Sequence, residues 1–188
     1  MLRPAAQFER FDHIDPAWLL ERGIRAVLLD LDNTLVPYRA YGECPPELRA
    51  WLDSLHAAGI QTMLVSNGSR RRVRYWRELL GIPGFGPAGK PWFGFNKALR
   101  RLRLNASEVA MVGDQLFTDV LGGNLVGALT ILVQPISKKE LGYTRLIRRL
   151  ERLILGTGNV GFMTGPSKQN EHFDPEINPE SRKIDSED

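Results

Sequence analysis

Four aspartates stand where a protein chain can present reactive side chains. Asp30 and Asp32 end the apolar run RAVLLDLD, Asp114 follows the run EVAMVG, and Asp119 comes shortly after it. Residues i and i+2 of an extended strand point to the same side, so Asp30 and Asp32 are expected to leave the strand together. Two carboxylates held this close repel each other unless a cation neutralises them.

A hydroxyl and an ammonium group complete this set. Ser66 and Asn67 follow a second apolar run and offer a hydroxyl and loop amides, while Lys90 lies between Gly89 and Pro91, before a helical pattern. Phosphoryl transfer needs a metal on the phosphate oxygens, a cation to neutralise developing charge, and a nucleophile in line with the leaving oxygen. Oxygen ligands without Cys or His favour Mg²⁺. A carboxylate nucleophile that forms an aspartyl-phosphate is established chemistry.

These residues need elements that bring them to one place. Short runs rich in Val, Ile and Leu predict buried parallel strands, and the segments between them have the pattern of amphipathic helices. The predicted strands are Arg25–Leu31, Ile60–Ser66, Glu108–Gly113 and Leu129–Val133, with a further strand around Phe85; the predicted helices are Pro46–Ala58, Ser69–Leu80, Pro91–Leu104 and Thr118–Gly127. This alternation predicts an α/β fold with a doubly wound, mostly parallel sheet and helices on both faces. Ligands of such sheets bind beyond the carboxyl ends of the strands, where the polar residues lie.

Four motifs in order resemble those of the haloacid dehalogenase (HAD) superfamily of phosphatases: DLDNTL, the Ser66 position, Lys90 and GDQLFTD, covering about residues 20–135. The closer likeness is to the YqeG-type members of subclass IIIA. It rests on LDLDNTLVPY, LVSNG, AGKPW and MVGDQLFTDVLGGN. That branch is similar to the plastid and mitochondrial phosphatidylglycerophosphate phosphatases. The resemblance implies a Mg²⁺-dependent phosphoric monoester hydrolase with a HAD-like Rossmannoid fold.

The resemblance also implies a role for each motif residue. Asp30 would be the nucleophile and a Mg²⁺ ligand, and Asp32 would be the general acid and base, with its backbone carbonyl also on the metal. Asp114 would bind Mg²⁺ and Asp119 would support the metal site. Ser66, Asn67 and Lys90 would bind the phosphoryl group, although Asn67, like Asn33, also fits a residue that shapes its loop.

Composition and charge describe the rest of the chain. The 188 residues are 43% hydrophobic and 25% charged, typical of a globular protein. We expect one phosphatase domain over residues 1–155, which is basic, and a disordered acidic tail over residues 156–188. The one cysteine, Cys44, excludes an intrachain disulfide, and the three histidines, at positions 13, 56 and 172, have no metal-ligand spacing.

The chain carries no sign of a membrane-spanning or secretory segment. No run reaches the ~18–20 apolar residues that a spanning helix needs, and the N-terminal sequence MLRPAAQFERFDHID lacks the apolar core of a signal peptide. We therefore expect a cytoplasmic protein, either free in the cytoplasm or peripheral on a membrane.

Motif spacing limits the substrate. One helix and one strand fill most of the interval from Asp32 to Ser66, and the same holds from Ser66 to Lys90, so neither interval has room for a cap domain of at least ~50 residues. An uncapped crevice is open to the head of something large, such as a lipid, a protein or a nucleic-acid end. The basic composition agrees best with an anionic phospholipid at a membrane surface, and less well with nucleic acid.

Two basic stretches bear on the partner. One is a cluster within the helix Ser69–Leu80: Arg70, Arg71, Arg72, Arg74 and Arg77. The other, Lys138–Arg152, has a helical period that places Arg145, Arg148, Arg149 and Arg152 on one side. Such a helix packs on the sheet with its arginines in solvent, or meets anionic lipid, and both can hold at once because a buried apolar face leaves the arginines free to bind headgroups.

Two classes of function remain from sequence alone. The first is a phosphatase, with phosphatidylglycerophosphate as the leading substrate and another large phosphorylated molecule as the alternative. The second is a basic assembly factor that binds RNA or a ribonucleoprotein, with incidental phosphatase activity. The full set of reactive residues favours the first class.

Four aromatic residues fall on helical patterns and are expected to pack in or near the core: Trp51, Trp76, Trp92 and Phe95.

Overall fold

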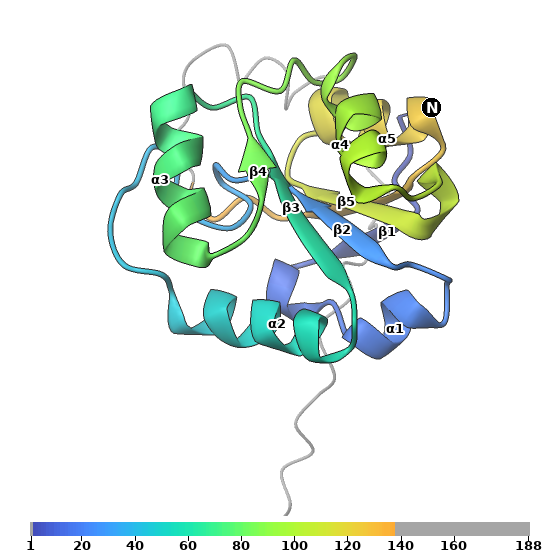
Figure 1. The fold of residues 1–188 in the computed structure, drawn as a ribbon, viewed down its shortest axis with the longest axis horizontal. Coiled ribbons are helices and arrows are strands. Elements are labelled where there is room, and N and C mark those ends of the chain that lie inside the picture. The colour runs from blue at the N-terminus through green and yellow to red at the C-terminus, as the bar shows by residue number, and fades with distance from the viewer. Residues whose placement is uncertain (1, 138–188) are drawn as a thin grey trace, which may run out of the picture.

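The computed structural model describes residues 2–137 (Figure 1). Its strands are β1 (Ala6–Phe8), β2 (Ala26–Leu29), β3 (Gln61–Val65), β4 (Gly84–Phe85), β5 (Val109–Gly113) and β6 (Leu129–Val133). Its α-helices are α1 (Pro16–Leu20), α2 (Pro46–Ala57), α3 (Arg70–Leu80), α4 (Gly94–Leu102) and α5 (Leu121–Val126). The 3₁₀ turns are η1 (Phe11–His13) and η2 (Ala106–Glu108), and a π-helical segment, η3 (Leu116–Val120), leads into α5. The predicted basic helix within Lys138–Arg152, the end of the predicted domain and the acidic tail lie outside the described residues.

All six strands form one parallel sheet in the order β1-β6-β5-β2-β3-β4. The chain builds outward from β2 through β3 to β4, then crosses back to place β5 on the other side of β2. The strand order therefore reverses between β2 and β5. A crevice forms at such a switch point because the connections after the two strands turn to opposite sides of the sheet.

Side-chain alternation along the central strand explains why both faces are covered. Val27 and Leu29 belong to the core cluster that holds the apolar residues of α1, α2 and α3. Ala26 and Leu28 point to the other face, into the cluster that holds the apolar side of α4. Figure 1 shows α1 and α2 on one side of the sheet and α4 with α5 on the other. A parallel strand that is covered on both faces has a continuous apolar sequence, as β2 does.

The predicted α/β class, the parallel sheet and its four main strands are confirmed, and so is the short strand at Phe85. Helix α3 begins at Arg70 with Ser69 as its N-cap, as the pattern predicted. The helix expected over Pro91–Leu104 begins later, at Gly94, because the preceding residues form a turn in which Trp92 and Phe93 donate backbone hydrogen bonds to Gly89. The helix expected over Thr118–Gly127 is two segments, η3 and α5.

The four tryptophans differ in burial: Trp51 and Trp76 are buried, Trp18 is half-buried and Trp92 is exposed. Trp51, Trp76 and Phe95 are buried, as predicted. Trp92 is 61% exposed, so its prediction as a packing residue is wrong. The reason is local, because Trp92 belongs to the turn before α4 and not to the helix whose periodicity it extends.

Neither motif interval contains a cap domain in the described chain. Between β2 and β3 lie a loop and α2, and between β3 and Lys90 lie α3 and β4. Within residues 2–137, no helix is both long and apolar enough to cross a membrane.

Candidate active site

A crevice of about 500 Å³ opens at the carboxyl ends of β2, β3 and β5. Four loops supply its walls: those after β2, β3 and β5, and the loop that carries Lys90. The lining residues are Asp30, Asp32, Tyr38, Arg39, Tyr41, Ser66, Asn67, Gly68, Ser69, Arg72, Lys90, Gln115 and Thr118. The topology thus brings together residues that are separated by up to 88 positions in the sequence, from Asp30 to Thr118.

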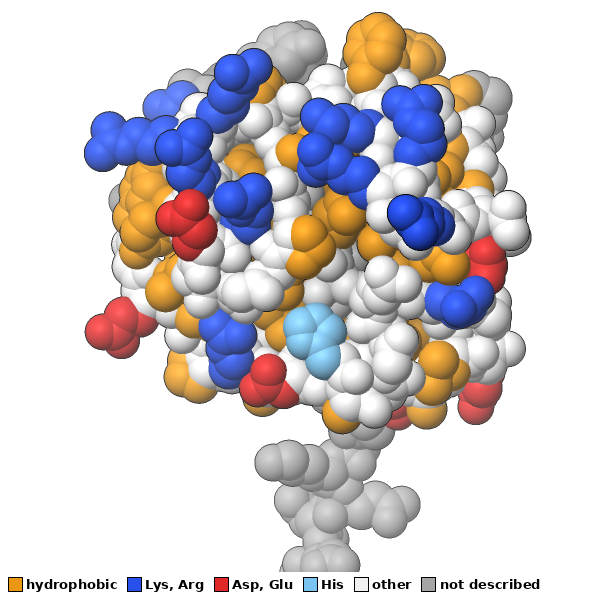
Figure 2. Space-filling model, in the orientation of Figure 1, with side chains coloured by type: hydrophobic (Ala, Val, Ile, Leu, Met, Phe, Trp, Pro, Cys, Tyr) orange, Lys and Arg blue, Asp and Glu red, His pale blue; other side chains and the backbone are white. Residues whose placement is uncertain are grey.

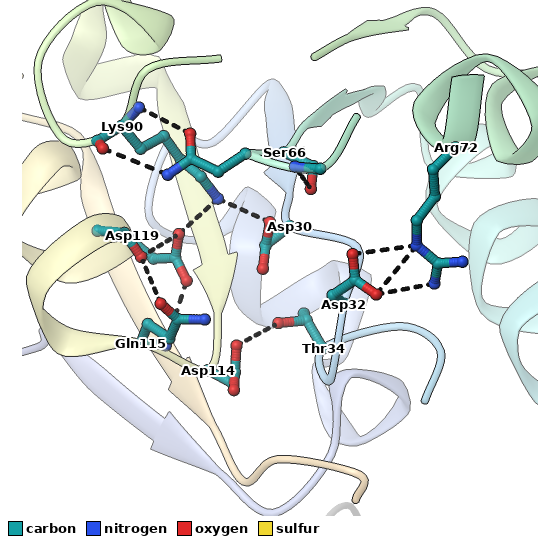
Figure 3. A network of polar contacts seen from close by, with 12 residues as sticks. Asp30, Asp32, Thr34, Ser66, Arg72, Lys90, Asp114, Gln115 and Asp119 are labelled. Atoms are coloured by element: carbon teal, nitrogen blue, oxygen red, sulfur yellow. Dashed lines mark hydrogen bonds and ion pairs between the residues drawn. The ribbon is translucent and has the colours of Figure 1, made fainter. Parts of the chain in front are cut away.

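At the base of the crevice, Lys90 lies between two aspartates (Figure 3). Its Nζ is 2.7 Å from Asp30 Oδ1 and 2.6 Å from Asp119 Oδ1, and all three side chains are almost fully buried. Burial on its own lowers the pKa of Lys90, but the charges and hydrogen bonds of Asp119 and Asp30 outweigh it and leave the pKa raised. The ammonium is therefore charged at neutral pH and fixes the orientation of Asp30.

Asp119 is held from several sides. The backbone N–H of Gln115 donates to its Oδ2 at 3.2 Å, and the Thr118 hydroxyl lies 3.3 Å from its Oδ1. Burial, opposed by Lys90 and reinforced by Asp30, raises the pKa of Asp119 to about 6. Gly113 leaves room for the Asp119 carboxylate, since a Cβ at residue 113 would lie 2.1 Å from Asp119 Oδ2.

A third carboxylate completes a group that fits a metal ion. One oxygen from each of Asp30, Asp114 and Asp119 lies within 4.8 Å of the others, and all three residues are buried. Thr34 Oγ1 is 3.3 Å from Asp114 Oδ1 and so helps to orient it. Three carboxylates and the Lys90 ammonium give a net charge of −2 at neutral pH, which a divalent cation would balance. Buried carboxylates of like charge are costly without such compensation, so the residues present fit Mg²⁺.

Asp32 points away from this group, toward α3 (Figure 3). Arg72 Nη2 lies 2.8 Å from Asp32 Oδ1, and Arg72 Nε donates to both carboxylate oxygens at 3.0 and 3.1 Å. The backbone N–H of Arg39 also donates to Oδ1, at 2.8 Å. A Cβ at Gly68 would lie 3.4 Å from both Asp32 Oδ2 and Ser66 Oγ. Oδ2, the less engaged oxygen, therefore faces the part of the crevice that Ser66 lines.

The same arginine ties down the loop after β2. Arg72 Nη1 donates to the backbone oxygen of Ala40, and its guanidinium lies 5.1 Å from the ring centre of Tyr41. Trp76 Nε1 donates to the same Ala40 oxygen at 3.2 Å, and the Tyr75 hydroxyl donates to Gly42 O at 2.8 Å. Helix α3 thus fixes both Asp32 and the loop that forms one wall of the crevice.

Ser66 and Asn67 have different surroundings. The Ser66 hydroxyl accepts a hydrogen bond from the Gly68 N–H at 3.1 Å and keeps its own proton for a bound oxygen. The Asn67 side chain is engaged with the backbone of Lys90, accepting from its N–H at 2.9 Å and donating to its carbonyl at 3.3 Å. Asn67 therefore shapes the loop that presents Lys90, which was one of its two predicted roles.

The structure brings all seven predicted site residues together. Five of them line the crevice, and Asp114 and Asp119 join through the carboxylate group that they form with Asp30. Neither Thr34 nor Arg72 was expected from the sequence to have an individual role. Thr34 belongs to the motif DLDNTL, which was a usable signal. Arg72 is one of three consecutive arginines, and nothing in the local pattern singles it out.

Similarity to known proteins shows the family of the chain. The family model described as haloacid dehalogenase-like hydrolase matches residues 38–127. A curated protein of Bacillus subtilis, "Probable phosphatase YqeG", is 42% identical over 144 residues, covering 76% of this chain and 83% of that one. The Arabidopsis thaliana protein "Phosphatidylglycerophosphate phosphatase 1, chloroplastic/mitochondrial" is 29% identical over 163 residues; this chain spans 47% of its length. A crystal structure of a hypothetical protein from Xanthomonas campestris shares the fold, with a TM-score of 0.51 at 20% identity, covering 71% of this chain and 74% of that one.

A parallel sheet with a carboxylate-rich crevice at its switch point defines a phosphoryl-transfer enzyme of the HAD type. The chain belongs to the haloacid dehalogenase-like hydrolase family, together with the B. subtilis relative. Within that family it is a phosphatase.

Proposed function

We propose that this phosphatase removes the terminal phosphate of phosphatidylglycerophosphate in two steps, with Asp30 as the nucleophile. The observation that carries the chemistry is the buried arrangement of Lys90 between Asp30 and Asp119, beside Asp114. Lys90 holds the Asp30 carboxylate in place and supplies positive charge where the phosphoryl group would lie.

In the first step, an Asp30 carboxylate oxygen attacks phosphorus and the bond to the glycerol oxygen breaks. Asp32 protonates the departing glycerol oxygen, so the leaving group is a neutral alcohol. The Ser66 hydroxyl and the Lys90 ammonium donate hydrogen bonds to the phosphoryl oxygens and stabilise the charge that develops there. The products of this step are phosphatidylglycerol and an aspartyl-phosphate at Asp30.

In the second step, Asp32, now a carboxylate, takes a proton from water as the water oxygen attacks phosphorus. The bond between phosphorus and Asp30 breaks, which releases inorganic phosphate and restores the free carboxylate. Asp30 and Asp114, with Asp119 beside them, would hold Mg²⁺; when bound, the ion supplies charge neutralisation of the phosphate oxygens.

The substrate proposal rests on the open crevice and on the plant relative. Within residues 2–137 no cap covers the crevice, so a phosphomonoester on a bulky lipid can reach its floor. Tyr38 and Arg39 line its wall, and Arg39 is exposed. An exposed guanidinium at that place suits the second phosphate of phosphatidylglycerophosphate, which carries one phosphodiester and one phosphomonoester.

Phosphate release from a substrate panel tests this proposal. The panel compares phosphatidylglycerophosphate in detergent micelles with phosphatidate, a phosphopeptide, a 5′-phosphorylated oligonucleotide and a sugar phosphate. We expect the highest kcat/KM with phosphatidylglycerophosphate and background release by the Asp30→Asn variant. A higher kcat/KM with any other class would assign the enzyme to that class instead.

Replacing Asp32 with asparagine is expected to lower kcat/KM about 10²–10⁴-fold on an alkyl phosphate, the usual range for loss of general acid catalysis. Asparagine keeps an oxygen that accepts from Arg72, so the fold should persist. The loss should be much smaller on p-nitrophenyl phosphate, whose leaving group departs without a proton. Equal losses on both substrates would show that Asp32 does not protonate the leaving group.

Arg72→Lys should lower kcat about 10–100-fold, the value of one or two charge-assisted hydrogen bonds, with a small change in KM. Lysine keeps the charge but lacks the planar fork that binds Asp32 and the Ala40 carbonyl together. The matched control is Arg71→Lys, on the neighbouring exposed arginine, which should behave as wild type. A raised KM with unchanged kcat would mean that Arg72 binds substrate and does not position Asp32.

A further inference from the structure

Positive charge is concentrated on one part of the molecule. Residues 69–104 contain ten Lys and Arg residues and a single acid, Glu78. Two of the bases, Arg72 and Lys90, are buried in the active site, and the other eight are exposed. Figure 2 shows basic side chains gathered over the upper part of the face that carries α3, β4 and α4. Like charges this close raise the free energy of the protein unless anions lie near them.

These bases surround a groove of about 220 Å³ between α3 and α4. Arg70, Arg74 and Arg77 line it from α3, Arg101 lines it from α4, and Phe85 of β4 lies between them. Lys97 Nζ and the Arg101 guanidinium lie 4.6 and 5.1 Å from the centre of the Phe85 ring. In the described chain, the one acid near a groove arginine is Glu78, 3.9 Å from Arg77. The groove therefore carries a net positive charge above an aromatic floor.

The groove lies beside the active-site crevice. Ser69 lines the crevice and Arg70, the next residue, lines the groove. The backbone oxygen of Phe85 accepts a hydrogen bond from the Ser66 N–H at 3.4 Å, so the groove floor and a phosphate-binding residue are neighbours in the sheet. An anionic surface that covers the groove would also cover the crevice mouth.

Two large exposed aromatic side chains precede α4, the helix that carries Lys97 and Arg101. Trp92 and Phe93 are 61% and 77% exposed, on the turn that joins Lys90 of the active site to α4. Exposed aromatic rings beside clustered Lys and Arg are the combination that binds at the boundary between lipid headgroups and acyl chains. Single-stranded nucleic acid would also match this combination, since its bases stack on exposed rings. The lipid substrate of the proposed function favours a bilayer as the partner.

We propose that the surface formed by Arg70, Arg74, Arg77, Lys97 and Arg101, together with Trp92 and Phe93, binds an anionic phospholipid bilayer. We call these seven residues the α3–α4 surface. This proposal rests on the proposed function and extends it, because it assigns the place where the enzyme meets the membrane. The phosphates of neighbouring lipids lie along the groove, the two rings enter the interface, and the crevice opens onto the bilayer.

The test measures binding of the full chain to phosphatidylcholine vesicles with and without phosphatidylglycerol. The variant Arg70→Gln/Arg74→Gln/Arg101→Gln removes three charges from the surface. Arg3→Gln/Arg22→Gln/Arg25→Gln is the matched control, with the same change in net charge at exposed arginines elsewhere. We expect the surface variant to bind anionic vesicles about 10²-fold less tightly than wild type, and the control to change little.

Tryptophan fluorescence gives a second, independent readout. Trp92 is the exposed one of the four tryptophans, so its emission should shift to shorter wavelength on anionic vesicles and Trp92→Phe should abolish the shift. Equal vesicle binding by the surface variant and its control, or the absence of any emission shift, would overturn the proposal. So would a surface variant that loses affinity for single-stranded RNA while keeping its affinity for vesicles.

Failure of this proposal is distinguishable from failure of the proposed function. Hydrolysis of phosphatidylglycerophosphate in neutral detergent micelles needs no anionic bilayer. If that activity is present and vesicle binding does not depend on the α3–α4 surface, the docking surface is wrong and the substrate stands. If vesicles bind through the surface and the micellar substrate is not cleaved, the substrate is wrong.

Discussion

Asp30→Asn is expected to abolish turnover, with a loss of about 10⁴-fold or more, because the change removes the nucleophilic oxygen and one carboxylate of the metal group at once. The substitution is nearly isosteric. Lys90 keeps its ion pair with Asp119 and an oxygen to bind at position 30, so the variant should fold with an unfolding temperature close to that of wild type. Phosphate release with p-nitrophenyl phosphate and with phosphatidylglycerophosphate measures the effect.

The matched control for this variant is Asp53→Asn, an exposed aspartate on α2 that does not line the crevice. It carries the same charge change and should have wild-type activity. Substantial turnover by purified Asp30→Asn on both substrates would remove Asp30 from the role of nucleophile.

Removal of divalent metal should also stop the enzyme completely. Asp30, Asp114 and Asp119 carry a net charge of −2 after Lys90 is counted, which suits a divalent cation, so chelation with EDTA should abolish activity and added Mg²⁺ should restore it. Ca²⁺ should not restore it, because it takes about 6–8 oxygen ligands at longer distances, whereas Mg²⁺ holds about six in an octahedron.

Two measurements accompany the chelation experiment. EDTA already saturated with Mg²⁺ is the control and should leave activity unchanged. Asp114→Asn should raise the Mg²⁺ concentration needed for half-maximal activity, and Mg²⁺ should raise the unfolding temperature of wild type more than that of the variant. Full activity after exhaustive chelation would contradict a metal-dependent mechanism.

Much of the fold was predictable because buried parallel strands are marked locally. The strands β2, β3, β5 and β6 are continuous apolar runs, and each coincides with its predicted segment to within two residues at either end. Strand β1 was not predicted. It has three residues, Ala6–Phe8, and exists as a strand because it pairs with β6 far along the chain, a contact that no local pattern reveals.

The site residues that follow the ends of parallel strands could be predicted from the sequence. The four aspartates, Ser66 and Lys90 were identified because parallel strands end at one edge of the sheet. The role of Arg72 depends instead on the direction in which α3 crosses the crevice. Arg70 and Arg71 are exposed while Arg72 is 4% exposed, and only the packing of α3 through Val73 and Trp76 decides which of the three turns inward.

For Trp92 the sequence did carry a local pattern, but the prediction made from it was wrong. Its spacing from Phe95 continues a helical period, but the helix begins only at Gly94, and the turn that positions Lys90 leaves the ring in solvent. Sequence periodicity reports which positions share a face and does not report where the helix starts. The exposed ring became visible only in the folded chain, and it is one of the features that define the α3–α4 surface.

The covalent intermediate is the most direct test of this mechanism. Wild-type enzyme, quenched during turnover of phosphatidylglycerophosphate and reduced with borohydride, should contain homoserine in place of aspartate at position 30, since borohydride reduces an acyl-phosphate and leaves free carboxylates intact. Peptide mass spectrometry reads the position, and enzyme treated without substrate is the control. Homoserine at residue 30, dependent on substrate, is the predicted result; homoserine at another aspartate would contradict the assignment of Asp30 as the nucleophile.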